Sequence, residues 1–508
     1  MSVTERPHEG TDEGTATTMS ETAPERTTER DTASRPAPFL LLAAVVAVLV
    51  PARAAARPLE DIDLYWHILI GREVLAGTPV AEAGRGWSFA PVPDTWISTQ
   101  WLAEILFAWL HDTFGFQSIV VYRTVTVILA LGTLALVTLY KRPARAGAWP
   151  FAVAGLALAI TSQDRSQQLT YILAPLVGWW ALRLLRDGRV PRWWVVLPLV
   201  VVWANFHGGW LILPMALGFA VVARVLEVGV RDRAVIGGVL LAAGCGLAAA
   251  VSPSGLDNAL SLLRFSSSTG QIGEWGSVRL IDWQSMAIAL MLVTVVVAWA
   301  LGRHRPSRGE VLYVGLLFAF GYSAWRSSTP ACLMLAPAVT GILARALGDP
   351  DPLPEGTEQP LARTAAGLAV VGVLLGGVLA VTQTPVLDPD IPQDLLGQVR
   401  EHPEPQRVLN TYNVAGPLLF FGGPPPHVLV AVDGRADRYG GEYIDEYVDT
   451  LLLARPGWEQ MVADLDPTSA VLREDEPLAG ALVAQLGWVE VSREGRTVLL
   501  RPADAPGW

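Results

Sequence analysis

Cysteine, lysine and charge are all scarce in this sequence. Two cysteines occur among 508 residues, Cys245 and Cys332, and each lies inside an apolar run. The sequence therefore cannot hold a disulfide framework or a thiolate metal cluster. Lys141 is the single lysine, and charged residues make up 17% of the chain. We find no internal repeat and no glycine-rich motif of the kind that cradles phosphate.

Apolar residues dominate instead. They account for 51% of the chain and the mean hydropathy is +0.37, values typical of a multi-span membrane protein. Residues 1–36 differ, because they are rich in Thr, Glu, Ser, Pro and Arg without apolar periodicity. We interpret them as a disordered cytoplasmic tail. The sequence thus predicts three parts, the tail 1–36, a transmembrane domain 37–383 and an extracytoplasmic domain 384–508.

Apolar runs of membrane length recur along the second part and predict about eleven spans. We place them at 37–56, 117–140, 148–161, 169–186, 193–205, 209–227, 234–252, 285–302, 311–325, 330–346 and 364–383. Alternate connections are rich in arginine, and the positive-inside rule assigns these to the cytoplasm. The protein is therefore predicted to be a multi-pass protein of the cell membrane. Because the number of spans is odd, its C-terminal domain should lie on the outer side of that membrane. The runs 193–205 and 209–227 are either two spans with a tight turn or one broken helix.

The segment from Val386 onward holds the negative charge. It carries 20 Asp and Glu against 9 Arg, and the whole chain has a net charge of -11, which argues against nucleic acid as a partner. Short apolar runs predict a small α/β domain in this segment. We expect strands at 407–409, 428–432, 470–472, 488–491 and 497–500, and a helix over 444–452. Asp433-Gly434-Arg435 is predicted to be a turn.

A knot of acidic residues follows the first predicted span. Glu60, Asp61 and Asp63 fall within four positions, where we expect the chain to leave the bilayer. Ionisable groups beside a membrane core are costly and usually mark a site. Apolar residues at helical spacing over 64–75 and 99–114 predict two interfacial helices that frame these carboxylates.

These positions suit the chemistry of sugar transfer. That reaction needs a base to activate the acceptor and positive charge to hold a phosphate leaving group. Arginine suits the second role, because its planar fork binds phosphate oxygens in pairs. The predicted catalytic residues are Asp61 and Asp63. The predicted substrate-binding residues are Glu60, His67, Arg72, Glu104, Arg165, His207, Glu274 and Arg326.

Structural roles stay open for the same side chains. Asp61 and Asp63 also suit the N-terminus of a helix, where carboxylates are favourable. Arg165 and Arg326 also suit structural pairs with Asp164 or with backbone carbonyls. His207 suits a turn, and Glu274 suits a solvated loop. We predict no cofactor, although a divalent cation between the two aspartates is left open.

Several segments resemble a known superfamily. Asp61 to Glu73, with Trp96, Trp101-Leu102-Ala103-Glu104 and Phe114-Gly115, resembles the first outer loop of GT-C superfamily glycosyltransferases of the protein O-mannosyltransferase and lipid A aminoarabinose transferase type. Segments 203–209, 252–255, 274–275, 410–413 and 433–435 resemble a bacterial group of GT-C-like multi-span proteins. The resemblance implies a GT-C-like helical fold, a polyprenyl-phosphate sugar donor and one of the two aspartates as base. In the mannosyltransferase type the second acidic residue directly follows the first, whereas Ile62 separates them here, so the choice of base stays open.

Two functions follow from the sequence. The first is a membrane glycosyltransferase that moves a sugar from a polyprenyl phosphate to an envelope or lipid acceptor on the outer face. The alternative is a non-catalytic membrane protein that binds polyprenyl lipids or scaffolds an envelope assembly. The two differ in whether Asp61 or Asp63 faces a cavity within reach of an arginine. A transporter ranks third, because the mid-membrane stretches carry almost no charge.

Overall fold

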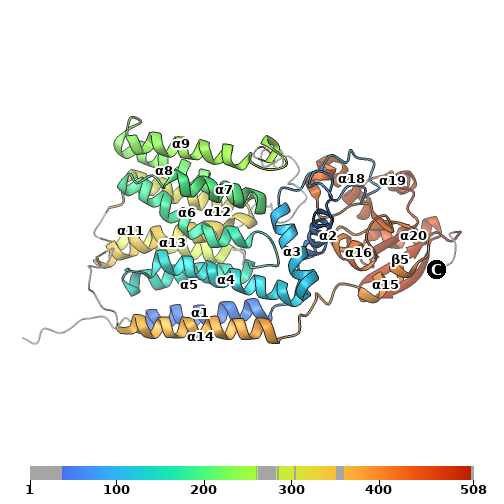
Figure 1. Cartoon of the computed structure of the whole chain (residues 1–508), viewed down its shortest axis with the longest axis horizontal. Coiled ribbons are helices and arrows are strands. Elements are labelled where there is room, and N and C mark those ends of the chain that lie inside the picture. The colour runs from blue at the N-terminus through green and yellow to red at the C-terminus, as the bar shows by residue number, and fades with distance from the viewer. Residues whose placement is uncertain are drawn as a thin grey trace, which may run out of the picture. The chain divides into compact units, whose positions relative to one another are not determined.

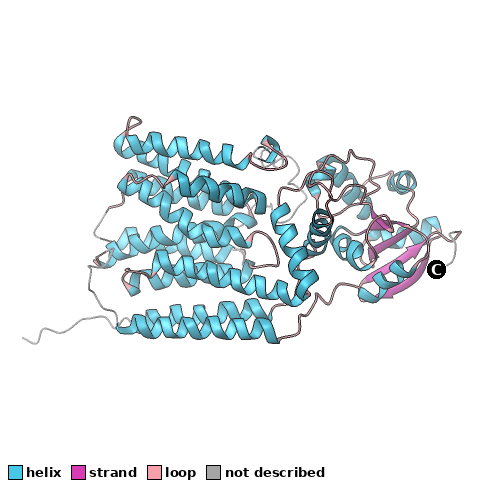
Figure 2. Cartoon of the chain, viewed as in Figure 1, coloured by secondary structure: helices cyan, strands magenta, loops and turns pink. Residues whose placement is uncertain are grey.

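The computed structural model describes residues 37–258, 260, 282, 285–302, 305–350 and 360–504. The predicted tail 1–36 and the predicted site residue Glu274 lie outside these ranges. Within them, long helices form a bundle that is joined to a small domain with a β-sheet (Figures 1 and 2).

Helices occupy the positions of all eleven predicted spans. They are α1 (Ala37–Ala56), α4 (Phe116–Thr138), α5 (Ala144–Thr161), α6 (Gln168–Asp187), α7 (Trp193–Phe206), α8 (Ile212–Val228), α9 (Arg233–Ala249), α11 (Met286–Leu301), α12 (Arg308–Ser323), α13 (Trp325–Leu347) and α14 (Pro360–Thr382). Five helical segments in the described part are long and apolar enough to cross a membrane by length and composition. They are Pro38–Ala56, Phe116–Thr138, Ala144–Thr161, Gly208–Val228 and Trp325–Leu347. The polytopic helical fold class is confirmed, and the number of spans stays a prediction.

Helix α13 lies at the centre of the bundle. It packs against α5, α6, α11 and α12, and most of its residues are buried. Gly178 of α6 lets the two backbones approach closely, because a Cβ there would lie 2.6 Å from Cα of Met334. Small residues at helix crossings are typical of membrane bundles. At the bundle's edge α1 packs along α14 and also contacts α4 and α5.

Two shorter helices lie between α1 and α4, as the sequence predicts. They are α2 (Asp63–Leu75) and α3 (Trp101–Phe114), which pack against each other, and α3 also contacts α4 and α7. Gly115 ends α3 with a φ of 69°, a conformation that favours glycine. The run 193–227 forms two separate helices, α7 and α8, joined through His207 and the short η1 (Gly208–Leu211).

The C-terminal domain has a five-stranded sheet in the order β2-β1-β3-β5-β4. Strands β1, β2 and β3 are parallel, whereas β5 is antiparallel to β3 and β4. All five predicted strands are observed: β1 (Gln406–Asn410), β2 (Val428–Val430), β3 (Ser469–Arg473), β4 (Val489–Glu494) and β5 (Thr497–Arg501). The helices are α15 (Gln393–Glu401), η4 (Tyr412–Val414), α16 (Ala415–Phe421), α17 (Ala436–Tyr439), α18 (Gly441–Leu451), α19 (Trp458–Leu465) and α20 (Pro477–Leu486). Of these the sequence predicts only α18.

The connection between α2 and α3 is bound to this domain. Ser88 forms a parallel bridge with Val430 at the β2 edge of the sheet. Phe89 N–H donates to Val430 O, and Val430 N–H donates to Trp87 O. The residues that follow the first and last bundle helices also meet, because Leu59 bridges Leu387. The C-terminal domain therefore docks on the segment that contains the acidic knot.

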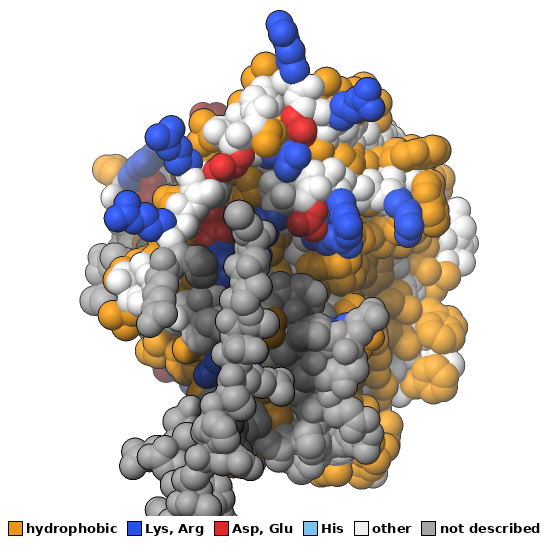
Figure 3. Space-filling model, turned by 90° about the vertical axis from the view of Figure 1, so that its left-hand side faces the viewer, with side chains coloured by type: hydrophobic (Ala, Val, Ile, Leu, Met, Phe, Trp, Pro, Cys, Tyr) orange, Lys and Arg blue, Asp and Glu red, His pale blue; other side chains and the backbone are white. Residues whose placement is uncertain are grey.

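Basic side chains gather at one end of the bundle (Figure 3). The connections between α4 and α5, α6 and α7, α8 and α9, and α11 and α12 carry exposed basic residues, among them Lys141, Arg189, Arg192, Arg231 and Arg305. These are the connections that the sequence assigns to the cytoplasm. Which face of a membrane they occupy stays a prediction.

Candidate active site

The two central aspartates flank the start of α2 and differ in exposure. The Asp61 side chain is fully buried, whereas that of Asp63 is 20% exposed. Asp61 Oδ1 accepts the N–H of Asp63, the first residue of α2, at 3.0 Å, while Ile62 holds the N-cap position. Asp63 Oδ1 accepts from Trp66 Nε1 at 3.0 Å. Of the two carboxylates, Asp63 is thus the one with exposed surface.

Arg165 bridges both aspartates. Its Nε donates to Asp61 Oδ2, and its Nη2 donates to Asp63 Oδ2 at 3.0 Å. Burial raises the pKa of Asp61 above its ordinary value, although the charge of Arg165 opposes this shift. A guanidinium therefore stands between the two carboxylates. The alternative pairing of Arg165 with Asp164 is wrong.

Asp164 instead pairs with an arginine that the prediction missed. Arg123 lies in α4 with its side chain fully buried, and its Nη1 donates to Asp164 Oδ1 at 2.9 Å. The same side chain donates to the carbonyls of Ala54 and Pro58 at 2.7 and 2.9 Å, and to that of Arg57. Burial raises the pKa of Asp164 to about 7 against the charge of Arg123. The signal was present in the sequence, since Arg123 is a charge inside an apolar run.

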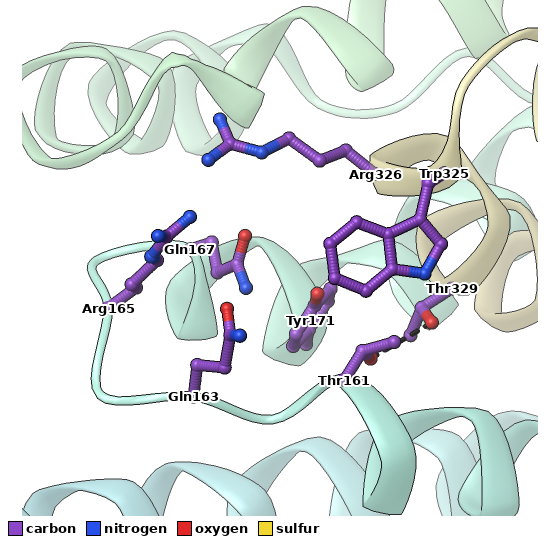
Figure 4. Close-up of a pocket in the computed structure, with 8 residues that line it drawn as sticks. All are labelled: Thr161, Gln163, Arg165, Gln167, Tyr171, Trp325, Arg326 and Thr329. Atoms are coloured by element: carbon purple, nitrogen blue, oxygen red, sulfur yellow. Dashed lines mark hydrogen bonds between the residues drawn. The ribbon is translucent and has the colours of Figure 1, made fainter. Parts of the chain in front are cut away.

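A polar pocket opens beside Arg165 (Figure 4). It encloses about 270 Å³, including space open to solvent. Its lining comes from the end of α5, the α5–α6 connection, the start of α6 and the start of α13: Thr161, Gln163, Arg165, Gln167, Tyr171, Trp325, Arg326 and Thr329. The side chain of Arg326 extends from the start of α13 toward Arg165, and the indole ring of Trp325 lies to one side, near Tyr171 and Thr329 (Figure 4). Two guanidinium groups and several amide and hydroxyl groups suit a phosphate ester.

Two predicted histidines lie in buried polar contacts. His67 Nδ1 is 3.1 Å from Oε1 of Glu104, whose side chain is fully buried, and the His67 ring lies 3.6 Å from that of Trp66. His207 Nδ1 accepts the Gly209 N–H and lies 2.9 Å from Thr170 Oγ1. Burial lowers the pKa of His207 to about 3, so its imidazole is neutral at physiological pH. The turn interpretation therefore describes His207, and a role in binding is a further prediction.

Other predicted residues have partners away from the pocket. Glu60 pairs with Arg57 at 2.6 Å and is 40% exposed. Arg72 lies at the opposite end of α2 from Asp63, where it binds Asp112 at 2.6 Å. Glu274 is outside the described residues.

The C-terminal domain also supplies a neighbour that the prediction missed. Tyr412, in η4, is half-buried, and burial raises the pKa of its phenol. The negative charges of Asp63 and Asp433 add to this shift, while the positive charges of Arg165 and Arg326 oppose it. Tyr412 therefore lies within electrostatic range of the aspartate–arginine cluster.

Within the described ranges, no three His, Cys, Asp or Glu side chains are grouped so as to hold a metal ion. Arg165 supplies the positive charge between Asp61 and Asp63. The prediction of no cofactor, with a divalent cation at this pair left open, stays untested.

Searches of family models and of curated protein sequences gave no match. Among solved structures the chain is similar to ArnT from Cupriavidus metallidurans, with 15% identity and a TM-score of 0.48 over 93% of this chain and 99% of that one. It is also similar to the arabinofuranosyltransferase AftD from Mycobacteria, with 16% identity and a TM-score of 0.47 over 92% of this chain and 42% of that one. Both are GT-C membrane glycosyltransferases, the type that the sequence resembles. The likeness is one of fold, and at TM-scores below 0.5 it carries no argument about activity.

Proposed function

We propose that the protein is a membrane glycosyltransferase that moves a sugar from a polyprenyl-phosphate donor to an envelope or lipid acceptor on the outer face. One observation carries the proposal. Asp63 is a partly exposed carboxylate bound to Arg165, and Arg165 lines a pocket together with Arg326. A base and two phosphate-binding cations therefore converge on one site.

Asp63 is the base in this reaction. The acceptor hydroxyl oxygen bonds to the anomeric carbon as Asp63 accepts the hydroxyl proton. The bond from that carbon to the phosphate oxygen breaks, and its electron pair leaves with the polyprenyl phosphate. Attack opposite to the leaving group inverts the anomeric centre. Arg165 and Arg326 stabilise the charge that develops on the phosphate.

Arg165 has a second part in the mechanism. In the resting site its Nη2 occupies Asp63 Oδ2, while its Nε stays on the buried Asp61. A donor phosphate competes for the same guanidinium. Its arrival loosens the contact with Asp63 and leaves that oxygen for the acceptor hydroxyl, while Asp61 keeps the arginine in place.

Mass spectrometry of envelope glycans and glycolipids tests the proposal in a deletion strain that is complemented with variants. Wild type should restore a missing product, whereas Asp63→Asn should lower its formation by about 10²–10⁴-fold, the contribution typical of a general base. The matched control is Asp464→Asn, an exposed acid on α19. Full product from Asp63→Asn would remove the transferase assignment.

One observation favours the non-catalytic alternative. Arg165 is already engaged by two carboxylates, and a transferase must break one of these contacts. Binding of polyprenyl phosphate to protein in nanodiscs separates the two functions. If Arg326→Gln abolishes binding while Asp63→Asn leaves every envelope product unchanged, the protein is a lipid-binding scaffold.

A further inference from the structure

Arg435 of the C-terminal domain is a buried charge in a region predicted to be a plain turn. Its side chain is fully buried and pairs with the equally buried Asp433, with Nη2 to Oδ2 at 2.6 Å and Nε to Oδ1 at 3.0 Å. The guanidinium carbon lies 4.9 Å from the ring centre of Trp87 and 5.1 Å from that of Trp96. Burying an ion pair is costly unless every contact is well made. A simple turn requires neither a buried ion pair nor two aromatic rings around it.

The two rings around Arg435 come from the connection between α2 and α3. Trp87 Nε1 donates to Glu73 of α2 at 2.9 Å, which fixes one ring. The other ring, Trp96, packs edge-on against Trp66 of α2 with centroids 6.3 Å apart. Trp66 in turn donates its Nε1 to Asp63. Packed groups therefore run without a break from Arg435 to the proposed base.

Gly434, between the paired Asp433 and Arg435, touches that hydrogen bond directly. A Cβ on Gly434 would lie 2.6 Å from Trp66 Nε1 and closer still to Asp63 Oδ1. Real Cβ atoms essentially never approach another heavy atom within 3.0 Å. The φ of Gly434 is not in the left-handed region, so the need for glycine is one of space rather than of backbone conformation. The side chains of Asp63 and Trp66 therefore pack directly against the backbone of Gly434.

We propose that the Asp433-Gly434-Arg435 segment is a positioning element for Asp63. The buried ion pair holds the Gly434 backbone rigid, and that backbone keeps Asp63 Oδ1 on Trp66. Asp63 Oδ2 is then presented to Arg165 and to the acceptor. This inference rests on the proposed function for its catalytic meaning, but the positioning itself is a property of the fold. A displacement of about 1 Å at a reacting group can lower a rate by about 10²-fold.

Gly434→Ala tests the contact between the Gly434 backbone and the Asp63 and Trp66 side chains, and Gly480→Ala is its matched control. Gly480 lies exposed on α20 of the same domain, and a Cβ there meets nothing within 4 Å. The first readout needs no substrate: the full-length protein in detergent is treated with a water-soluble carbodiimide and an amine, and labelling of the Asp63 carboxylate is followed by peptide mass spectrometry. Labelling should rise severalfold in Gly434→Ala and stay at the wild-type level in Gly480→Ala.

Trp66→Phe is the second variant, because it removes the donor to Asp63 without adding an atom. It should raise the labelling of Asp63 as Gly434→Ala does. Asp94→Asn breaks another contact of the domain, the 3.0 Å pair with Arg438, and should leave the labelling unchanged. If the Asp433-Gly434-Arg435 segment serves only to dock the C-terminal domain, labelling of Asp63 should be equal in all four variants. That result would overturn the inference.

The second readout is the envelope product in the complemented deletion strain. Gly434→Ala should reduce it by about 10²-fold while the bound polyprenyl phosphate per protein stays near wild type. If wild type restores no product, the proposed function fails, and the labelling contrast still decides the positioning. If the product is lost in Gly434→Ala without a change in labelling at Asp63, the positioning role is overturned and the transferase remains.

Discussion

Arg123→Met is the perturbation whose outcome the structure fixes most closely. Arg123 ties the carbonyls of Ala54 and Pro58, at the end of α1, to Asp164 in the connection between α5 and α6. That connection also carries Arg165. Methionine fills much of the same space but leaves Asp164 buried without its partner.

The expected loss of unfolding free energy is about 3–5 kcal/mol, the range for breaking a buried ion pair from one side. The abandoned carbonyls act in the same direction, at about 1–3 kcal/mol for a buried group left without a partner, although these terms do not simply add. Protonation limits the loss, because burial already raises the pKa of Asp164 to about 7 with Arg123 present. The double variant with Asp164→Leu should recover at least about 2 kcal/mol as coupling energy.

The raised pKa also gives a pH dependence with a definite sign. A buried carboxyl whose pKa lies above the ordinary value of 3.8 binds its proton more tightly in the folded state than in the unfolded state. Folding stability from this group is therefore fully present below 3.8 and is lost as the pH rises through the folded pKa. Arg123→Met should be more stable in mildly acidic than in mildly alkaline buffer, relative to the double variant.

Equilibrium unfolding in detergent micelles measures these differences. Arg72→Met is the matched control, because Arg72 pairs with Asp112 at the surface, where the side chains are 37% and 43% exposed. Exposed pairs contribute about 0–1 kcal/mol. If Arg123→Met loses no more stability than Arg72→Met, the buried pair does not hold α1 to the Arg165 loop and the reasoning is refuted.

Two further predictions concern helix contacts. Because burial lowers the pKa of His207 from 6.5 to about 3, stability from the neutral ring is present above 6.5 and is lost as the pH falls toward 3. His207→Gln should flatten this part of the thermal-midpoint profile, and an unchanged profile would contradict it. Gly178→Ala should lose about 1–3 kcal/mol by forcing α6 from α13. A Cβ at Gly132 would meet nothing within 4 Å, so Gly132→Ala should lose no unfolding free energy. Equal unfolding free energies for the two variants would count against the close crossing of α6 and α13.

Most helices and all five strands could be predicted because each depends on local apolar periodicity. The eleven apolar runs became helices, and α2 and α3 followed their spacing. Helices α15, α16, α19 and α20 were missed, because they are short segments between Pro- and Gly-rich turns. The sequence could not decide between two helices and a broken one at His207, since both patterns look alike along a chain.

The candidate site shows where local reasoning ends. Asp61 and Arg165 were each identified, but their contact joins residues 104 positions apart and could not be predicted from either neighbourhood. Ordinary turn chemistry described Asp433-Gly434-Arg435, because nothing beside Arg435 announces that Trp87 and Trp96 will enclose it. Exposure, which separates Asp63 from Asp61, is likewise set by packing rather than by the motif.

The bridge between Leu59 and Leu387 has a consequence for biosynthesis. Asp61 and Asp63 leave the ribosome hundreds of residues before Tyr412 and Gly434, which complete the surroundings of these carboxylates. A nascent chain that stops before the C-terminal domain therefore contains Asp63 without the residues of that domain that pack against it. If the proposed function holds, the site becomes complete only when translation is nearly finished, and a partly synthesised membrane domain should not consume the lipid donor.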